Sequence, residues 1–218
     1  MLDGVETEAM EVLTGVIASD GGVYQQKHAA IKSPFFKVTQ SGILHHDWLL
    51  VVRGALATLG VDVPSIYPRA YNGVNSSGNP YVYTVLQSRT HPLMVSLRDL
   101  WYPKGVKEIP LSFRLSPISL AHMTMGDGSS SWHQGGNIVA CLSTQNFSER
   151  SIELVEDALR GIGIDHTGRG HVKLKNKKSG SGIVITLLQD SVDDFMAMIE
   201  PHVVPSFRYK VKYRGTKC

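Results

Sequence analysis

Residues 13–21 read Leu-Thr-Gly-Val-Ile-Ala-Ser-Asp-Gly, and residues 120–128 read Leu-Ala-His-Met-Thr-Met-Gly-Asp-Gly. Each stretch is a short apolar segment that ends in the pair Asp-Gly. In the first stretch, Gly15 and Ser19 are one helical turn apart, and small residues at this spacing let two helix backbones approach closely. We therefore expect two related helices, each ending in a carboxylate, and we expect them to pack against each other.

The two carboxylates, Asp20 and Asp127, lie where a negative charge is unfavourable. The C-terminal end of a helix carries partial negative charge on its free carbonyl groups, so a bound cation would remove the penalty. Mg²⁺ prefers carboxylate and carbonyl oxygens completed by water. The pattern therefore predicts a metal site at each Asp-Gly pair, with Ser19 and Gly126 as the adjoining ligands. A single Asp-Gly pair is usually only a turn, so the hypothesis depends on the repetition.

The two stretches belong to an internal repeat. Three pairs of segments match in the same order: 38–41 with 143–146, 55–62 with 158–165, and 83–88 with 185–190, at offsets of 105, 103 and 102 residues. Three ordered matches at nearly one offset indicate a duplicated chain. The alternative is two unrelated segments that happen to share similar helix ends.

The hydrophobic pattern of each copy predicts helix, two strands, helix, two strands and helix. In the first copy the helices are expected over 9–19, 45–59 and 91–101, and the strands within 23–40, 65–72 and 80–87. In the second copy the helices are expected over 117–126, 148–161 and 191–200, and the strands within 131–145, 170–176 and 182–188. The predicted fold class is α+β, with two pseudo-symmetric αββαββα half-domains at 1–110 and 111–218. Each would be an antiparallel four-stranded sheet with helices on one face, and the two would pack through their central helices.

Composition excludes several classes of protein. The chain has 218 residues, of which 42% are hydrophobic and 19% charged, as in globular rather than disordered proteins. Its two cysteines, Cys141 and Cys218, form neither a metal-ligand spacing nor a disulfide framework, which favours a reducing compartment. The acidic N-terminus does not resemble a signal peptide, and no apolar run approaches the ~20 residues that cross a bilayer. We therefore expect no membrane partner, while the net charge of +3 leaves nucleic acid open.

Basic and polar residues alternate along two predicted sheets. In the second copy they are Arg169, His171, Lys173, Lys175 and Lys177. Because residues two apart on a strand share a face, this spacing predicts a basic stripe on one side of the sheet; a solvated strand is the alternative. The first copy is more polar, with Tyr24, Gln26, His28, Lys37, Arg69 and Tyr71. Such side chains suit phosphate neutralisation and base reading in the major groove of DNA.

With these features the chain resembles the LAGLIDADG homing endonucleases in their single-chain, two-copy form. Residues 13–21 align with the family's nine-residue motif, and residues 117–128 with the variant common in the C-terminal copy. Further similar stretches are 100–103, 107–110, 142–145 and 204–210. Two departures concern Ala18 and Met125, which replace the motif's first Asp, a position that does not bind metal in the family. A third is His122, which stands where the first copy has Gly15 and which we interpret as a packing residue.

The resemblance implies a monomeric, site-specific double-stranded DNA endonuclease that takes part in intron homing. Such an enzyme hydrolyses phosphodiesters on both strands with metal-activated water and leaves 3′ overhangs. Its partner would be a long pseudo-palindromic DNA target, and its cofactor two or three Mg²⁺ ions, with Mn²⁺ or Ca²⁺ able to substitute for binding.

The resemblance also implies catalytic residues beyond the carboxylates. Gln40 and Gln145 match polar residues that organise the water network, and Lys107 and Lys210 match basic residues near each scissile phosphate. A lysine there can stabilise developing negative charge. The alternative for each lysine is a solvated loop charge.

A second hypothesis is an RNA maturase that binds its host intron RNA and assists splicing, and a third is a transcription repressor on the same fold. The four residues Asp20, Asp127, Lys107 and Lys210 together favour the nuclease, because a pure binding protein need not retain them. The compartment would be an organelle, such as a mitochondrion or chloroplast, or a prokaryotic cytoplasm.

Overall fold

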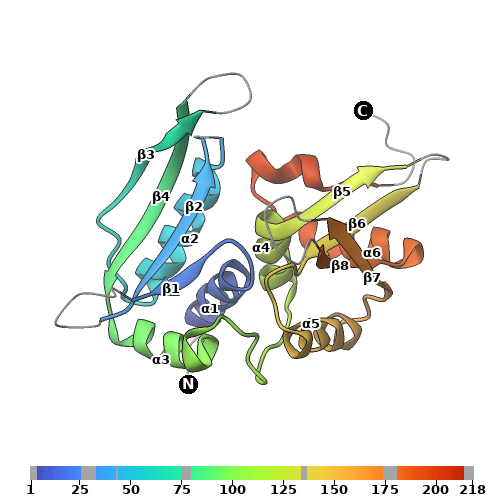
Figure 1. Cartoon of the computed structure of the whole chain (residues 1–218), viewed down its shortest axis with the longest axis horizontal. Helices are drawn as coiled ribbons and strands as arrows, with labels where there is room; N and C mark the ends of the chain where they lie inside the picture. The colour runs from blue at the N-terminus through green and yellow to red at the C-terminus, as the bar shows by residue number, and fades with distance from the viewer. Residues whose placement is uncertain are drawn as a thin grey trace. The chain divides into compact units, whose positions relative to one another are not determined.

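The chain forms two compact units, each with one four-stranded antiparallel sheet and its helices (Figure 1). The computed structural model describes residues 4–25, 33–42, 44–74, 80–133, 137–173 and 181–213. The first unit is Met1–Leu100 with Val204–Ser206, and the second is Trp101–Val203 with Phe207–Cys218. The expected α+β class and the two pseudo-symmetric halves are confirmed.

The element order αββαββα occurs in both units. The first unit contains α1 (Gly4–Ile17), β1 (Gly22–Tyr24), β2 (Phe35–Ser41), α2 (His46–Thr58), β3 (Ser65–Val74), β4 (Pro80–Thr90) and α3 (Pro92–Trp101), with strand order β1-β2-β4-β3. The second contains α4 (Pro117–Asp127), β5 (Gly128–Trp132), β6 (Ile138–Ser143), α5 (Glu149–Gly161), β7 (His166–Lys173), β8 (Ser181–Leu187) and α6 (Gln189–Ile199), with order β5-β6-β8-β7. Short 3₁₀ helices are η1 (Pro103–Gly105), η3 (Glu200–His202) and η4 (Pro205–Lys210).

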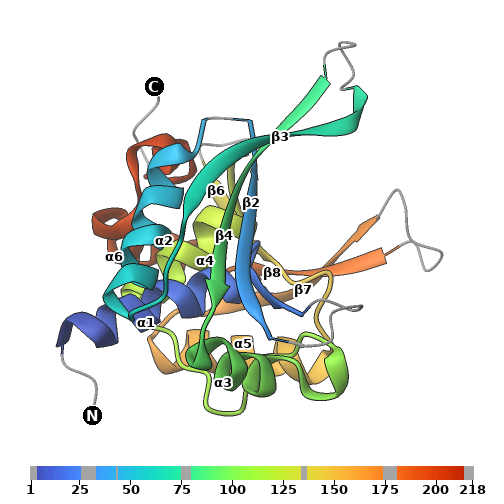
Figure 2. The same ribbon diagram turned by 90° about the vertical axis from the view of Figure 1, so that its left-hand side faces the viewer.

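Helices cover one face of each sheet. Along β2, the side chains of Phe36, Val38 and Gln40 are buried while the alternate positions are not, and along β6 the buried side chains are those of Ile138, Ala140 and Leu142. Successive side chains of a strand point to opposite faces, so these residues lie on the covered face. We call the other side of each sheet its open face. In Figure 2, α2 lies beside the strands of the first sheet, next to β3.

The boundary between the units lies ten residues before the expected one at 110, because the connecting segment packs into the second unit. The ring of Trp101 meets that of Phe113 edge-on, with centroids 6.0 Å apart. The backbone N–H of Glu108 donates to the carbonyl of Trp101 at 2.8 Å, and that of Ile109 donates to the hydroxyl of Ser151 at 2.9 Å.

A short C-terminal segment joins the first unit instead. Ser206 donates twice to the carboxylate of Asp47 at the start of α2, from its backbone N–H at 3.0 Å and from its hydroxyl at 2.6 Å. These hydrogen bonds keep the pKa of Asp47 below its ordinary value, although partial burial opposes them. The contact explains why Val204–Ser206 belongs to the first unit.

Steric crowding requires glycine after each terminal aspartate. A Cβ on Gly21 would lie 2.7 Å from Cγ1 and 2.9 Å from the carbonyl oxygen of Val16. A Cβ on Gly128 would lie 2.6 Å from the carbonyl oxygen of Thr124. Glycine therefore allows the chain to turn directly from the helix into the first strand, which leaves the aspartate at the helix end.

His122 is buried in α4 with 2% of its surface exposed, which agrees with its interpretation as a packing residue. Burial, together with electrostatic repulsion from His202, lowers the pKa of His122 from 6.5 to about 4. Desolvation disfavours the charged imidazolium, so the folded protein holds His122 neutral.

This burial predicts a pH-dependent loss of stability. Between about pH 6.5 and pH 4 the unfolded chain binds a proton at His122 that the folded chain does not bind, so stability falls as the pH falls through that window. At 1.36 kcal/mol per pKa unit the effect is about 3 kcal/mol. Urea unfolding at pH 7 and near pH 4 should show a smaller stability loss for His122→Gln than for the original chain. His46→Gln, on the exposed surface of α2, is the control, and an unchanged pH dependence in His122→Gln would contradict the prediction.

Candidate functional site

The first Asp-Gly pair holds its carboxylate in a defined orientation. Asp20 is exposed just beyond α1, and the side-chain amide of Gln40 on β2 donates to its Oδ2 at 2.7 Å. Gln40 is itself 8% exposed, so its amide is held by the surrounding core. The hydroxyl of the neighbouring Ser19 donates back into the helix, to the carbonyl of Gly15 at 3.0 Å. Two residues predicted from the sequence, Asp20 and Gln40, are thus in direct contact.

The donor atoms at Asp20 fit a divalent metal ion. Among the ion pairs of the described residues, none involves Asp20, so no side-chain cation offsets its charge in that way. The described residues contain no cluster of three or more His, Cys, Asp or Glu. Mg²⁺ does not require such a cluster, because one or two carboxylates with water and substrate phosphates usually suffice.

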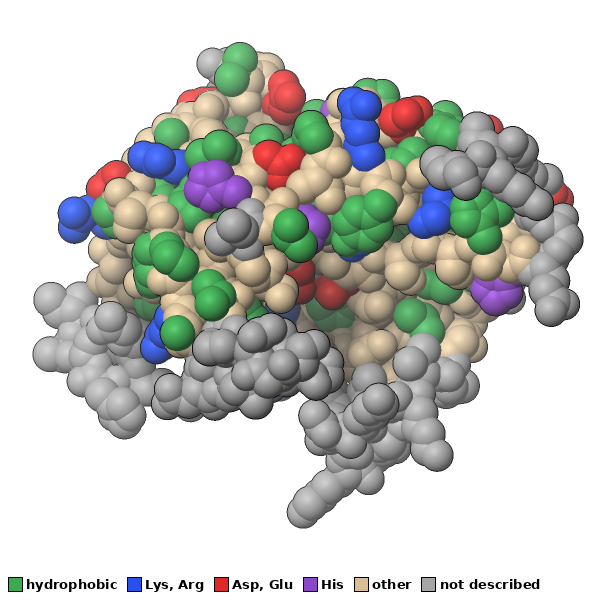
Figure 3. Space-filling view, turned by 90° about the horizontal axis from the view of Figure 1, so that it is seen from above, with side chains coloured by type: hydrophobic (Ala, Val, Ile, Leu, Met, Phe, Trp, Pro, Cys, Tyr) green, Lys and Arg blue, Asp and Glu red, His purple; other side chains and the backbone are tan. Residues whose placement is uncertain are grey.

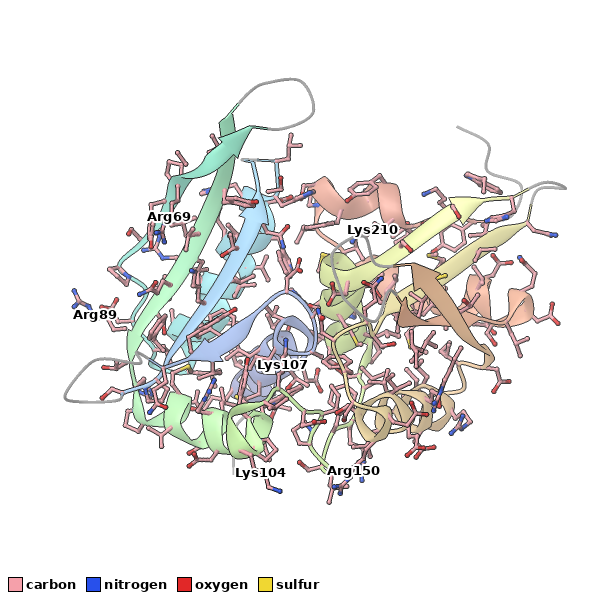
Figure 4. The ribbon with its side chains drawn as sticks, in the orientation of Figure 1. Arg69, Arg89, Lys104, Lys107, Arg150 and Lys210 are labelled. Carbon is pink, nitrogen blue, oxygen red and sulfur yellow. The ribbon has the colours of Figure 1, made fainter. Side chains whose placement is uncertain are left out.

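The second Asp-Gly pair differs, because a lysine occupies the helix end. Lys210 is 9% exposed, and its ammonium group donates to the carbonyls of Met125 at 2.7 Å, Thr124 at 3.0 Å and Gly126 at 3.3 Å. Figure 4 shows Lys210 beside α4. A cation at the C-terminal end of a helix is favourable because it compensates the partial charges of the last carbonyls.

The C-terminal residues near Lys210 also fold back onto the second sheet. The hydroxyl of Ser130 on β5 donates to the carbonyl of Lys210 at 2.6 Å, and the ammonium of Lys212 donates to the carbonyl of Ser130 at 3.1 Å. These basic residues therefore bind backbone oxygens of their own unit.

Lys107 has a different setting from Lys210, although the two are 103 residues apart and were expected to be equivalent. It lies in the second unit as well, with its ammonium 6.0 Å from the centroid of the Phe147 ring. The segment is anchored by the next residue, Glu108, whose carboxylate accepts hydrogen bonds from the hydroxyls of Ser148 and Ser151 at the start of α5. These bonds lower the pKa of Glu108.

Glu108 and its two serines were not identified as site residues from the sequence. The only signal was the spacing of Ser148 and Ser151, which is typical of a helix N-terminus. This spacing does not reveal that both hydroxyls donate to Glu108, which lies about 40 residues earlier in the chain.

Gln145 does not occupy the position equivalent to Gln40. Gly22 pairs with Lys37 in the first sheet, and Gly128 pairs with Leu142 in the second. When the two Asp-Gly pairs are aligned, Thr144 in the second copy is therefore equivalent to Gln40 in the first, and Gln145 lies one residue further along the chain. Thr144 is buried, and its hydroxyl donates to the carbonyl of Ile183 at 2.9 Å. A catalytic role of Gln145 stays a prediction.

The first sheet gathers the DNA-binding candidates of the first unit on its open face. Tyr24 pairs with Phe35, Lys37 with Gln87, and Arg69 with Tyr83, and all of these lie at open-face positions. The ammonium of Lys37 is 5.9 Å from the ring centroid of Tyr24, and Arg69 projects from β3 (Figure 4). The backbone of Tyr71 continues the alternation, and its side chain lies outside the described ones. Gln26 and His28 lie outside the described residues.

The predicted basic stripe of the second sheet is wrong for Arg169. Its guanidinium donates to both carboxylate oxygens of Glu156 on α5, at 2.9 and 3.1 Å, and it also pairs with Glu149. Its partner on β8 is the fully buried Ile185, so Arg169 lies on the covered face. A register irregularity between His166 and Gly168 sets this alternation, and a shift by one residue exchanges the two faces of a strand.

The side chains of the remaining members of that stripe lie outside the described ones. The backbones of His171 and Lys173 follow β7 in the same alternation as Arg169, and their side chains lie outside the described ones. Lys175 and Lys177 lie outside the described residues. Over the coloured part of the surface seen from above, basic, acidic and apolar side chains are interspersed (Figure 3). Of the helices in the described part of the chain, none has the length and apolar character needed to cross a membrane.

Comparison with solved structures gives the same fold. The structure of the homing endonuclease I-WcaI bound to its DNA recognition sequence has a TM-score of 0.72 and 20% sequence identity, covering 94% of this chain and 86% of that one. The structure of I-DmoI in complex with DNA and Ca has a TM-score of 0.55 and 12% identity, covering 90% and 91%. Other I-DmoI complexes contain DNA with Mn.

Curated relatives span nearly the whole chain. An uncharacterised protein of Methanocaldococcus jannaschii is 25% identical over 212 residues, which are 97% of this chain and 76% of that protein. The cytochrome b mRNA maturase bI2 of Debaryomyces hansenii is 24% identical over 211 residues, covering 95% and 74%. The model of the LAGLIDADG DNA endonuclease family matches residues 10–195, which is most of the sequence. The chain therefore belongs to the LAGLIDADG DNA endonuclease family.

Proposed function

We propose that this chain is a monomeric homing endonuclease that cuts both strands of a long, pseudo-palindromic DNA target and leaves 3′ overhangs. The observation that carries the proposal is the exposed carboxylate of Asp20, oriented by the buried amide of Gln40 at the end of a helix that recurs in the second unit with Asp127. Mg²⁺ is the proposed cofactor, because the ligands offered are oxygen atoms. The metal ions in the I-DmoI complexes support this choice.

In the proposed mechanism each half supplies the ligands for cutting one strand. Asp20 with the carbonyl of Ser19, and Asp127 with the carbonyl of Gly126, would hold divalent ions. In the second half the ion would replace the ammonium of Lys210, which lies 3.3 Å from the carbonyl oxygen of Gly126. The chemistry that such an ion supplies is activation of a water molecule and stabilisation of charge on the phosphate. Gln40 keeps one carboxylate oxygen of Asp20 engaged, so that the other oxygen faces away from the amide. Lys107 and Lys210 are the proposed cations that stabilise negative charge as it develops.

DNA binding is assigned to the open face of the first sheet and to the second sheet with its hairpin. On the first, Lys37 and Arg69 would neutralise phosphates or read guanine, and Tyr24 would contact the sugar or base edges. Arg169 is excluded from this role, because Glu156 already binds its guanidinium on the other face. The proposal keeps Gln26, His28, Tyr71, His171, Lys173, Lys175 and Lys177 as DNA-binding candidates.

The proposal predicts that each aspartate controls one strand. Asp20→Asn and Asp127→Asn keep the shape of the side chain and remove its charge, so each single variant should nick the target instead of cutting both strands. Loss of several kcal/mol of transition-state stabilisation corresponds to roughly a hundred- to thousandfold in the rate on the affected strand. The assay separates nicked from linear plasmid carrying a selected target site, in Mg²⁺.

Asp99→Asn, on the exposed surface of α3, is the matched control and should cut both strands at the original rate. Undiminished double-strand cutting by both Asp20→Asn and Asp127→Asn would refute the assignment of the metal ligands.

The three hydrogen bonds of Lys210 predict a structural cost that is separate from catalysis. Lys210→Met removes the donor from three carbonyls at the end of α4, and the free energy of unfolding should fall by about 1–3 kcal/mol. Lys104→Met, at an exposed turn, should change it by less than about 0.5 kcal/mol. Denaturant unfolding without metal measures both. Equal stability of the two variants would show that the bonds of Lys210 contribute nothing.

A second candidate function is RNA maturation, which the maturase relative supports. If the chain assists splicing, a variant carrying both Asp20→Asn and Asp127→Asn should still accelerate splicing of the intron RNA that encodes or flanks it, while cutting no DNA. A splicing assay with purified protein and a DNA cleavage assay on an intronless target distinguish the two functions. Acceleration of splicing without any cleavage by the original chain would favour the maturase.

A further inference from the structure

The two sheets have the same register, so their open-face positions can be compared one to one. Gly22 pairs with Lys37 and Tyr24 with Phe35 in the first sheet, as Ser129 pairs with Cys141 and Ser131 with Val139 in the second. The inner strands continue the correspondence, because Lys37 pairs with Gln87 and Cys141 with Thr186. The sequence match of 83–88 with 185–190, which aligns Gln87 with Gln189, is therefore three residues out of register. On the outer strands, Tyr67 pairs with Val85, and Gly170 pairs with Val184.

At five equivalent positions the first sheet has a long side chain and the second sheet has a small one. Tyr24, Phe35, Lys37, Tyr67 and Gln87 in the first unit correspond to Ser131, Val139, Cys141, Gly170 and Thr186 in the second. The first set has aromatic, basic and amide groups. The second set has hydroxyl, thiol, methyl and hydrogen groups only.

Charge differs between the open faces in the same way. The first carries Lys37 and Arg69. Among the described side chains of the second open face, none is charged, and the one described arginine of β7, Arg169, is held on the covered face by Glu156.

This difference matters for how bases are distinguished. Arg and Lys read guanine, and Asn and Gln read adenine, through paired hydrogen bonds that discriminate each base by about 1–3 kcal/mol. Serine and threonine bind to either kind of base, and glycine presents no side chain. A sheet with short neutral side chains can approach the groove, but it has few groups that recognise one base above the others.

We propose that the two half-sites of the DNA target are read unequally: the open face of the first sheet discriminates between bases, and the open face of the second sheet tolerates many sequences. The inference rests on the proposed DNA-binding function and concerns the described side chains of the two sheets.

The open face of the second sheet has room at one position, Gly170, for a side chain that recognises a base. A Cβ on Gly170 would make ordinary contacts of 3.6 Å with Val184 and 3.7 Å with Thr186, and its φ is not in the left-handed region. Gly168, with φ +123°, would be strained by any side chain. The Cβ of Gly170→Gln therefore fits without a steric conflict, and the substitution adds an amide on the open face at the position where the first sheet has Tyr67.

The test is selection of bound duplexes from a randomised DNA library with the full chain in Ca²⁺, followed by competition with single-base-pair variants of the selected site. In one half-site, substitutions should weaken binding by about 5- to 150-fold per base pair, as 1–3 kcal/mol requires. In the other half-site the effect should stay below about threefold. Lys37→Ala and Gln87→Ala should relax discrimination only in the sensitive half-site. Gly170→Gln should raise it in the tolerant one, and Cys141→Ala should leave the profile unchanged.

Two failures are distinguishable. If no DNA sequence is selected, the proposed function is wrong. If a site is selected and both halves discriminate equally, or if Cys141→Ala relaxes discrimination as strongly as Lys37→Ala, the inference is wrong while the DNA-binding function stands.

Discussion

The close contact between the last helical turn and the following glycine is the constraint on which the candidate site depends. A Cβ at Gly21 or Gly128 would approach a backbone carbonyl oxygen to within 2.9 Å or 2.6 Å, so only glycine lets the chain turn into the first strand at that point. The preceding aspartate is therefore held at the end of a helix, next to the carbonyl oxygens of the last helical turn. In this position a carboxylate is unfavourable alone and favourable with a cation. The need for glycine after the helix thus fixes a carboxylate at the negatively polarised end of the helix, where it requires a cation.

The two copies of the repeat satisfy that electrostatic constraint by different means. At the first helix end, the buried amide of Gln40 donates to Asp20. At the second, the ammonium of Lys210 binds three carbonyls of α4. A neutral donor orients a carboxylate without cancelling its charge, whereas a buried cation also offsets the partial charge of the helix end. The duplicated chain has therefore kept the helix ends and diverged in the groups around them.

The sheets show the same divergence on a larger scale. Their strand order is shared, and the pairings at the equivalent positions correspond, because a one-residue slip would move the hydrophobic side chains out of the core. The open faces are less restricted, since most of their described side chains are exposed or half-buried. Long polar and aromatic groups on the first face and small groups on the second are compatible with the same covered core. Because the register is kept while the open-face side chains vary, the two halves of one fold can bind different DNA sequences.

Much of this architecture was determined by the sequence alone. The repeat, the element order and the Asp-Gly helix ends follow from local patterns and from the ordered matches between the copies, whereas Gln40 was identified only through the family resemblance. Helix ends and alternation depend on residues close in the chain, so short segments encode them. The bounds of the strands differ from those expected, since β7 begins at His166, four residues before its expected start.

What the tertiary structure decided is which groups each side chain meets. The register irregularity near Gly168 placed Arg169 on the covered face with Glu156, and the sequence alternation alone could not show which face is open. Lys210 binds α4 across more than 80 residues, and Glu108 binds the start of α5 across about 40. Such contacts depend on how elements pack after they form, so no spacing rule along the chain contains them. The sequence thus determined where the carboxylates and the strands are, and the packing determined which faces and which partners they have.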